Sequence, residues 1–537
     1  MRRPLGNIRS PTQNAPQVLL LTLVDQRSNA ERITRMSSAP STLAQSAYPL
    51  PRHTFALAAI ALFFFVFGTR LLLIHAWGSP VPIGDEWDAD AFGIFRAWLN
   101  STLRWSDLFA AHNEHRIALT RISNLSLLIV EGRWNLWSEM MLGAALHAGC
   151  AAALFPLLAN ALSPSSRCGM LVGIAVLFAS TAGWQNALWG FQTQVYFANL
   201  LTVVAIGGML GSKPLKPIWW IGWSAALLAL FSNGSGVFAV VAILAVALLD
   251  MVTARRRPQP KMEGAALPRL PSRDPELVER ASAPLSELAE IVVRPSGNSS
   301  RAATALATIA VLVVLGFALR VDVPFHAPLK ARNFAEFYAV FARSLAWPQI
   351  DSAWLWPIVQ APVLWLTVDL IRRRSRPDSF ERFTLALAIV AMLHAAAIAY
   401  SRGAGLIEAR PLSRYQDPFL LGAAANLFIL LRYGSTHRAS RIAALGWIGV
   451  VLAGLMSITT SNFSLHLPYK SMQDRANFAM VRDYLDHHDP AVFARGSVLP
   501  GTASRGVLGH SCFGRSQTSP DSSLRTARRT VSATLAH

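Results

Sequence analysis

Long apolar stretches separated by short polar segments form the main pattern of this chain. The first apolar stretch runs from about 55 to 74 and is interrupted only by Gly68, Thr69 and Arg70. Because roughly 20 apolar residues cross the hydrocarbon core of a bilayer as a helix, this stretch predicts a membrane-spanning helix. Ten further stretches repeat the pattern, at about 138–160, 169–187, 193–211, 217–231, 235–252, 302–319, 353–371, 382–400, 418–432 and 441–459. The pattern predicts an all-α, polytopic integral membrane protein with about eleven transmembrane helices and a long first extracytoplasmic loop.

The polar segments divide the chain into regions. We expect two transmembrane regions joined by a linker, which is rich in Pro, Arg and Ser, and a terminal segment on either side of them. Within the first outer loop, the weakly apolar piece 117–130 is short and carries Arg121 and Asn124, so we expect it to lie along the membrane interface. The predicted regions are a disordered basic cytoplasmic tail (1–53), an N-terminal transmembrane region (54–252) containing the first outer loop (78–137), a cytoplasmic linker (253–301), a C-terminal transmembrane region (302–460) and a partly disordered extracytoplasmic tail (461–537).

Composition and charge agree with a membrane protein. Hydrophobic residues make up 53% of the chain and charged residues 15%, whereas soluble domains contain roughly 25% charged residues. The net charge of +19 could indicate nucleic-acid binding, but the basic residues form short blocks between apolar stretches, as at 255–257 and 372–376. This distribution follows the positive-inside rule. It predicts membrane lipids rather than nucleic acid as partners, and an inner (plasma) membrane protein with a cytoplasmic N-terminus and an extracytoplasmic C-terminus.

A cluster of acidic residues follows the first apolar stretch directly. Asp85 and Asp88 are three residues apart and would share one face of a helix or turn, while Glu86 and Asp90 share another. Crowded carboxylates raise one another's pKa, so one can hold a proton while its neighbour stays ionised, as a general base or a metal site requires. The alternative is that these acids only solvate an exposed loop.

A second charged group lies in the late loop 401–417. The predicted topology places this loop outside, where arginine is disfavoured, yet the loop carries three arginines. Arg410 and Arg414 are four residues apart, and guanidinium groups bind phosphate in a bidentate manner, so we expect the pair, next to Tyr415, to hold a phosphate at the membrane surface. Alternatively, the arginines pair with Glu408, Asp417 or lipid headgroups.

Two other polar groups are candidates for substrate binding. On a helix, His112, His115 and Arg116 would present two imidazoles and a guanidinium on one face to a phosphate or a sugar, or the imidazoles and Glu114 could bind a metal. A purely structural role in the loop is the third possibility. Near a later outer turn, polar side chains at membrane depth could line a sugar pocket or face a neighbouring helix. These side chains are Gln185, Asn186, Gln192 and Gln194.

Acidic residues after the first span and arginines in a late outer loop give the chain a family resemblance. It resembles the type C glycosyltransferase superfamily of polytopic membrane enzymes, which includes the protein O-mannosyltransferases and bacterial lipid-linked sugar transferases. In that superfamily the first outer loop often begins with Asp-Glu and continues through interfacial helices. Asp85-Glu86 and the region 98–137 match this plan, and the resemblance covers roughly residues 55–465.

The resemblance implies a function and roles for the residues. A sugar would pass from a polyprenyl-phosphate-linked donor to a lipid, glycan or protein acceptor on the outer face of the membrane. Asp85 would deprotonate the acceptor hydroxyl, with Glu86 or Asp88 assisting. Arg410 and Arg414, with Tyr415, would neutralise the leaving lipid phosphate. Some superfamily members hold a metal with acidic motifs in two loops, but this sequence has no second acidic motif in a predicted outer loop, so we expect metal-independent chemistry without a cofactor.

A function from another class also fits the same charges. A transporter or flippase for a lipid-linked or anionic solute could line its pathway with these acids and arginines. Transporters often contain inverted repeats and place charges within their spans, whereas this sequence has no convincing internal repeat and its charges cluster at the predicted outer ends. A ligase or polymerase of surface polysaccharide would share the donor chemistry and differ in the acceptor.

Overall fold

The computed structural model describes residues 52–255, 297–406, 411–434 and 438–489. The predictions for the tail 1–53 and the linker 253–301 therefore fall almost entirely outside the described residues, as does the end of the tail 461–537.

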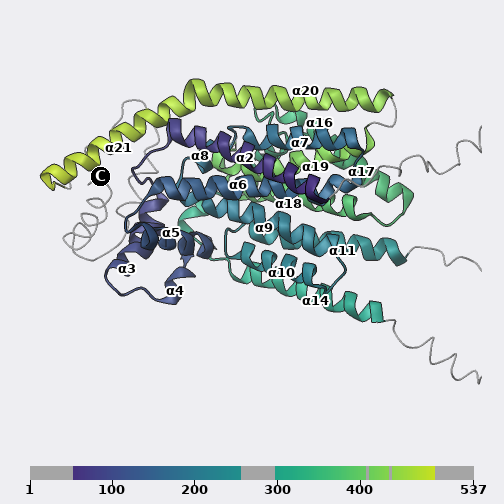
Figure 1. Cartoon of the computed structure of the whole chain (residues 1–537), viewed down its shortest axis with the longest axis horizontal. Helices are drawn as coiled ribbons and strands as arrows, with labels where there is room; N and C mark the ends of the chain where they lie inside the picture. Colours follow the sequence, from purple (N-terminus) through teal and green to yellow (C-terminus); the bar gives the residue numbers. More distant parts are fainter. Residues whose placement is uncertain (1–51, 256–296, 407–410, 435–437, 490–537) are drawn as a thin grey trace, which may run out of the picture. The chain divides into compact units, whose positions relative to one another are not determined.

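Long helices dominate the described residues (Figure 1). Each forms where an apolar stretch was predicted, because a helix satisfies its own backbone hydrogen bonds in a solvent that offers none. The longer helices are α2 (Arg52–Trp77), α6 (Leu136–Leu158), α9 (Thr193–Gly211), α11 (Gly236–Arg255), α14 (Gly297–Ala318), α18 (Ser379–Arg402) and α20 (Arg438–Ser461). The shorter ones are α7 (Pro164–Ala179), α10 (Pro217–Leu230), α16 (Trp356–Val359), α17 (Ala361–Arg373) and α19 (Asp417–Tyr433).

Seven helices in the described ranges are long and apolar enough to cross a membrane, or up to eight if the bent pair 353–359 and 361–373 forms one span. This finding supports a helical membrane protein. It does not confirm the predicted eleven spans, because α7 and α10 are shorter apolar helices and α19 has only 17 residues. The uncertain spans are thus those whose apolar length falls below the thickness of the hydrocarbon core.

Polar caps fix where several of these helices begin. The Ser163 hydroxyl accepts a hydrogen bond from the backbone N–H of Ser166 before Pro164 starts α7. Asp378 and Glu381 form a reciprocal capping box at the start of α18. In both places the side chain satisfies backbone N–H groups that the first helical turn leaves without an intrahelical partner.

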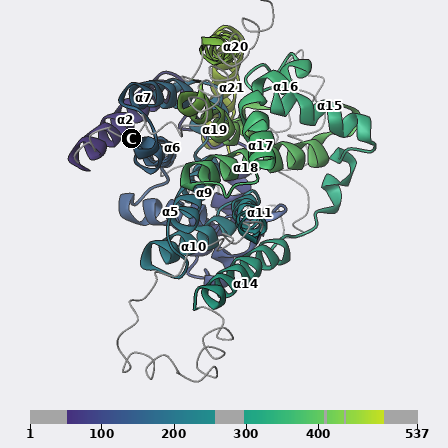
Figure 2. The ribbon, with the colours of Figure 1, turned by 90° about the vertical axis from the view of Figure 1, so that its right-hand side faces the viewer.

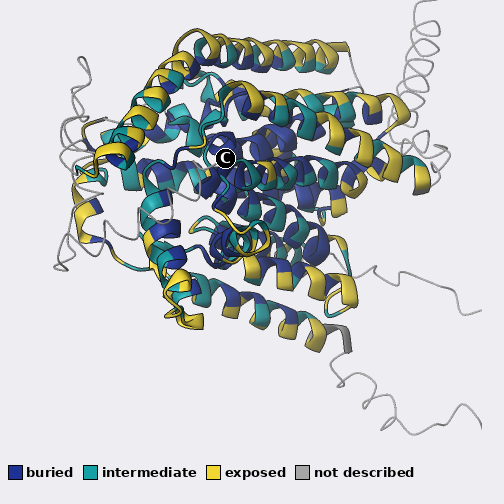
Figure 3. Ribbon diagram, turned by 60° about the vertical axis from the view of Figure 1, so that its left-hand side comes forward, coloured by how far each residue is buried: buried dark blue, intermediate teal, exposed yellow. Residues whose placement is uncertain are grey.

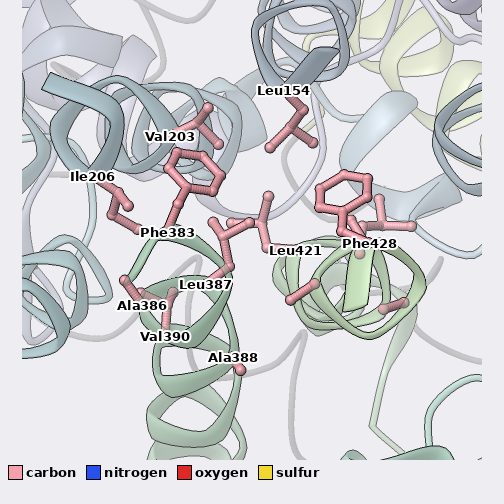
Figure 4. Packing of buried hydrophobic residues seen from close by; sticks show 14 of the residues in the cluster. Leu154, Val203, Ile206, Phe383, Ala386, Leu387, Ala388, Val390, Leu421 and Phe428 are labelled. Carbon is pink, nitrogen blue, oxygen red and sulfur yellow. The ribbon is translucent and has the colours of Figure 1, made fainter. Parts of the chain in front are cut away.

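The middle of the helical region is formed by α9, α18 and α19, with α14 and α20 at its edges (Figure 2). In the span Gly190–Gly211, which contains α9, 72% of the most apolar part is buried, whereas in Ser300–Ala318, within α14, the buried share is 17%. Leu154, Val203, Phe383 and Phe428 meet in this core (Figure 4). Small residues such as Ala386 let the backbones approach closely, as helix packing in a membrane requires.

The connections between helices meet at two opposite ends. At one end the backbone N–H of Leu119 donates to Phe231 and that of Val321 donates to Glu114, which ties three connections together. We call this the acidic end, because it carries the segment 84–90. At the other end Arg376 pairs with Asp250, and we call it the arginine end.

The acidic end is built from short elements. They contain a single two-stranded antiparallel sheet, the only strands among the described residues. In order these elements are the π-helix η2 (Glu86–Phe95), α3 (Arg96–Leu99), α4 (Trp105–Leu108), β1 (Ala111–His112), β2 (His115–Arg116) and α5 (Ala118–Glu131). In Figure 1 the helices α3, α4 and α5 lie together at the left.

The piece predicted to lie along the interface forms the amphipathic helix α5. Its polar residues Thr120, Arg121 and Asn124 are buried, and α5 contacts η2, α6 and α9. The buried guanidinium of Arg121 donates to the backbone carbonyls of Asp107 and Ala110. The polar side of α5 therefore holds the preceding loop, which contains Asp107 and Ala110. Figure 3 shows this mixture of buried and exposed positions around the acidic end.

After α20 the chain continues through the π-helix η9 (Asn462–His466) into α21 (Leu467–His487). The Lys470 ammonium donates to the backbone carbonyl of Trp77 at the end of α2, and the Asn462 amide donates to the carbonyl of Thr181. The start of α21 is therefore attached to the acidic end.

Candidate functional site

A glycine and an indole set the entry to the acidic segment. Gly84 has a φ of +51°, and a side chain there would come within 3.2 Å of the Trp189 ring. Glycine suits both the left-handed backbone and the close approach. The turn it makes brings Asp85 to the N-cap position of η2.

The four carboxylates of this segment divide by burial into the two pairs that their spacing predicted, although the segment is a π-helix. Glu86 and Asp90 are buried, while Asp85 and Asp88 are half-buried. Glu86 accepts hydrogen bonds from the backbone N–H groups of Ile83 and Phe191. Burial raises the pKa of Glu86 to about 8, and the neighbouring Asp90 acts in the same direction. Glu86 therefore faces the protein interior, as a carboxyl group that holds its proton at neutral pH.

Asp85 is the accessible member of the cluster, with a side chain 36% exposed. Its Oδ1 lies 3.8 Å from Nε2 of His112, whose ring packs on Phe191 with centroids 5.1 Å apart. Burial alone would raise the pKa of Asp85, but contact with His112 and the positive charge of Arg414 bring it below the ordinary value. By contrast, burial and then the charge of Asp85 raise the pKa of Asp88. At neutral pH Asp85 is therefore an ionised and partly exposed carboxylate.

Arg414 reaches this place from a distant part of the chain. It lies half-buried in η8 (Ser413–Tyr415), a 3-10 helix of one turn that directly precedes α19. Its guanidinium carbon lies 5.1 Å from the centre of the Tyr415 ring, a distance typical of a cation–π contact. The charge of Arg414 lowers the pKa of Asp85, so the late arginine loop lies near enough to the early acidic segment for its charge to act there. Arg410, the predicted partner of Arg414, lies outside the described residues.

The group His112 to Arg116 differs from its prediction. These residues form a β-hairpin and not one helical face, and His112 is paired directly with His115 across the two strands. A left-handed Asn113, with φ of +50°, makes the tight turn at the tip, which the spacing alone did not indicate.

The hairpin side chains point to different neighbours. The Glu114 Oε1 lies 2.9 Å from Nδ1 of His326, and the Arg116 guanidinium donates to the backbone carbonyl of Phe109. Burial, and then the nearby His112, lower the pKa of His115 to about 4, so it is neutral at physiological pH. Of this group, His112 is the residue in contact with Asp85.

The polar residues of the turn 181–194 are structural neighbours of the site. Gln192 is buried at the N-cap position of α9. Gln194 accepts a hydrogen bond from the Asn233 amide. Gln185 and Asn186 bond to the turn that carries Arg414. This arrangement agrees with polar groups that face neighbouring elements.

A buried group beneath the site had a weak signal in the sequence. The Arg70 side chain in α2 is 2% exposed, and its Nη2 lies 4.0 Å from Oδ1 of Asp417, which is fully buried. The same nitrogen contacts the His147 ring at 3.0 Å and donates to the carbonyl of Phe178. Arg70 was visible as a charge inside an apolar stretch, but its partners lie 77 residues or more away along the chain, so no local pattern could pair them.

Cavities add little to the site. A void of about 10 Å³, about the smallest that can hold one water molecule, lies beside Glu86 and Lys470. An open apolar groove of about 610 Å³ lies between α9 and α10, away from Asp85, and is lined by Leu201, Trp220 and Ile221 among others. We assign the groove to the lipid-facing surface, because Ile221 is exposed and apolar. Within the described ranges, no three His, Cys, Asp or Glu side chains are placed to hold a metal ion.

Comparison with known proteins gives no relative for this chain: no family model, curated protein or solved structure matches it.

Proposed function

We propose that this chain is a membrane glycosyltransferase, which transfers a sugar from a polyprenyl-phosphate-linked donor to an acceptor on the outer face of the membrane. The observation that carries the proposal is that one segment, 181–192, contacts both the turn that carries Arg414 and the residue next to Asp85, and the charge of Arg414 lowers the pKa of Asp85 although the two residues are far apart in sequence. An ionised carboxylate and a guanidinium in one half-buried place can serve the two charged species that glycosyl transfer from a phosphate creates.

The reaction assigns one role to each group. Asp85 accepts the proton of the acceptor hydroxyl while that oxygen forms a bond to the anomeric carbon of the sugar. The bond between this carbon and the phosphate oxygen breaks, and the lipid phosphate leaves with one additional negative charge. Arg414, placed against Tyr415, stabilises that charge in half-buried surroundings, where electrostatic interactions are stronger than in water.

The surrounding residues fit supporting roles. His112 lies beside Asp85 and can orient its carboxylate. Asp88 is half-buried on the same face as Asp85 and can bind sugar hydroxyls. Glu86 is buried and bonded to backbone N–H groups, so we assign it to holding the segment and not to proton transfer.

The test is transfer of radiolabelled sugar from a polyprenyl-phosphate donor pool in membranes that contain matched amounts of each variant. Asp85→Asn and Arg414→Ala should each lower the transfer rate by about 100-fold or more, the range for a lost general base or charge-stabilising group. Arg376→Ala at the arginine end, where the side chain pairs with Asp250, should retain transfer. Full transfer by both site variants would exclude this mechanism.

A transporter or flippase of a lipid-linked or anionic solute is the second candidate. The observation in its favour is the group of Arg70, His147 and Asp417, because ionisable residues within membrane helices often mark transport pathways. The same membranes distinguish the two functions. A transporter would move labelled donor across the bilayer without joining the sugar to an acceptor, and a transferase would produce labelled acceptor.

A further inference from the structure

The segment 181–192 contacts both halves of the proposed site. It contains the short helix α8 (Trp184–Ala187) and the 3-10 turn η4 (Gly190–Gln192), between α7 and α9. Both elements are only one turn long, yet most of the segment is buried. Its contacts explain why.

Toward the arginine loop, the segment forms a set of hydrogen bonds with the turn that carries Arg414. The Ser413 hydroxyl donates to the carbonyl of Ala182 at 2.6 Å and accepts from the backbone N–H of Gln185 at 3.2 Å. The Gln185 side-chain oxygen accepts from the backbone N–H of Arg414 at 3.0 Å. The Asn186 amide donates to the carbonyl of Arg414 at 3.0 Å and to Oδ2 of Asp417 at 2.7 Å.

Both backbone polar groups of Arg414 are therefore held by adjacent side chains of the same short helix. A single-turn element such as η8 has few bonds of its own to define its position. The two bonds from Gln185 and Asn186 fix the backbone from which the Arg414 side chain extends.

Toward the acidic segment, the same chain stretch makes three contacts. The Trp189 ring lies against Gly84, and the backbone N–H of Phe191 donates to Glu86. The Phe191 ring packs on His112, the residue beside Asp85. These contacts hold the residues on either side of Asp85 in the sequence, together with its neighbour in space.

We propose that the segment 181–192 is the positioning element of the site, and that Gln185, Asn186 and Ser413 are positioning residues that hold Arg414 in register with Asp85. The kinetic effects expected from this inference rest on the proposed function. A small displacement of Arg414 would weaken its hold on the donor phosphate, since displacements of about 1 Å can cost about 100-fold in rate. The acceptor site beside Asp85 would stay intact.

The kinetic test uses pairs of matched variants in the full chain. Asn186→Leu removes the amide at nearly constant volume, and Ser413→Ala removes the hydroxyl, while Ser413→Thr keeps it. We expect Asn186→Leu and Ser413→Ala to raise the KM for a polyprenyl-phosphate sugar about tenfold, with the KM for the acceptor unchanged. Ser413→Ala should leave the Tm in detergent nearly unchanged, whereas Asn186→Leu should lower it, because it also removes a hydrogen bond to the buried Asp417. Ser413→Thr should behave as wild type. An unchanged donor KM in both loss variants, or an equal rise of the donor and acceptor KM values in Ser413→Ala, would overturn the proposal.

A second measurement separates this inference from the proposed function. In a chain whose other cysteines are replaced by serine, Gln185→Cys with Ser413→Cys should form a disulfide rapidly under mild oxidant, because the two residues are in hydrogen-bond contact. This pair replaces Gln185 and Ser413, so the cross-link tests the remaining bond from Asn186 to the carbonyl of Arg414, and adding Asn186→Leu should slow it at least several-fold. If wild type transfers no sugar but the cross-link behaves in this way, the proposed function fails and the positioning role stands. Cross-linking at the same rate with and without Asn186 refutes the positioning role.

Discussion

The two ends of the helical region differ in how closely their charged side chains are paired. At the arginine end Arg376 binds both oxygens of Asp250, at 2.5 and 2.6 Å, with its side chain 54% exposed. Arg432 and Asp378 form another pair there. The buried Glu381 at that end is also closely paired, with Arg373 and Tyr433. At the acidic end two of the charged groups have looser partners: Arg70 lies 4.0 Å from the buried Asp417, and His112 lies 3.8 Å from Asp85.

The difference separates charges that serve topology from charges that require a special environment. Exposed, bidentate pairs cost little and add little, and they fit the arginine-rich loops expected at a cytoplasmic surface. Buried ionisable groups are costly unless they are fully paired, so their presence indicates a role other than stability. This contrast favours the acidic end as the functional end.

Replacing Arg70 by a neutral side chain should give the largest difference in stability between the two ends. Arg70→Met leaves Asp417 buried without its cation and should cost about 3–5 kcal/mol of stability, as expected for half of a buried ion pair. Arg376→Met at the arginine end should cost about 1 kcal/mol or less, since Arg376 is exposed and Arg382 still pairs with Asp250. Thermal unfolding in detergent measures both.

Pairing Arg70→Met with Asp417→Asn controls this experiment. The double variant carries no charge at either position of this pair and should recover part of the stability lost in Arg70→Met. Equal losses for Arg70→Met and Arg376→Met would show that the two ends do not differ in the way we describe.

The pH dependence of stability sharpens the comparison at a single residue. Burial raises the pKa of Glu86 in the folded protein from 4.5 to about 8, so the folded state binds more protons than the unfolded state between these values. Its contribution is fully present below pH 4.5 and is lost as pH rises toward 8. Wild type should therefore melt several degrees lower at pH 8.5 than at pH 5. Glu86→Gln, which stays neutral, should show a clearly smaller decline, and an identical decline would contradict the buried, protonated carboxyl group.

The smallest effect is expected at the tip of the hairpin. Glu114 was predicted to bind substrate, but its carboxylate contacts His326. Because Gln keeps an oxygen that can accept from His326, Glu114→Gln should change the transfer rate by less than about twofold. A loss of tenfold or more in the transfer assay would return Glu114 to the substrate-binding group.

The sequence predicted the elements that depend on local pattern. Apolar stretches identified the helices, and the three- and four-residue spacings of Asp85, Glu86, Asp88 and Asp90 predicted which carboxylates share a face. The number of spans did not follow, because short helices such as α7 (Pro164–Ala179) lie at the limit of membrane thickness.

Long-range partners could not be predicted in the same way. The contact of Asn186 with Arg414 joins residues 228 positions apart, and no periodicity encodes such a pair. The hairpin at His112 to Arg116 was missed because two-residue strands carry no alternating pattern, and its turn uses Asn113 without the following glycine that usually marks one.

The central claim is that Asp85 and Arg414 act in one site, and a double-mutant cycle on the transfer rate tests it most directly. Asp85→Asn, Arg414→Ala and the double variant would be compared with wild type in membranes with matched protein levels. If the two groups serve the same transition state, their losses should not add, and the double variant should be only slightly slower than the slower single variant. Losses that multiply fully, or single variants that transfer at the wild-type rate, would contradict the claim.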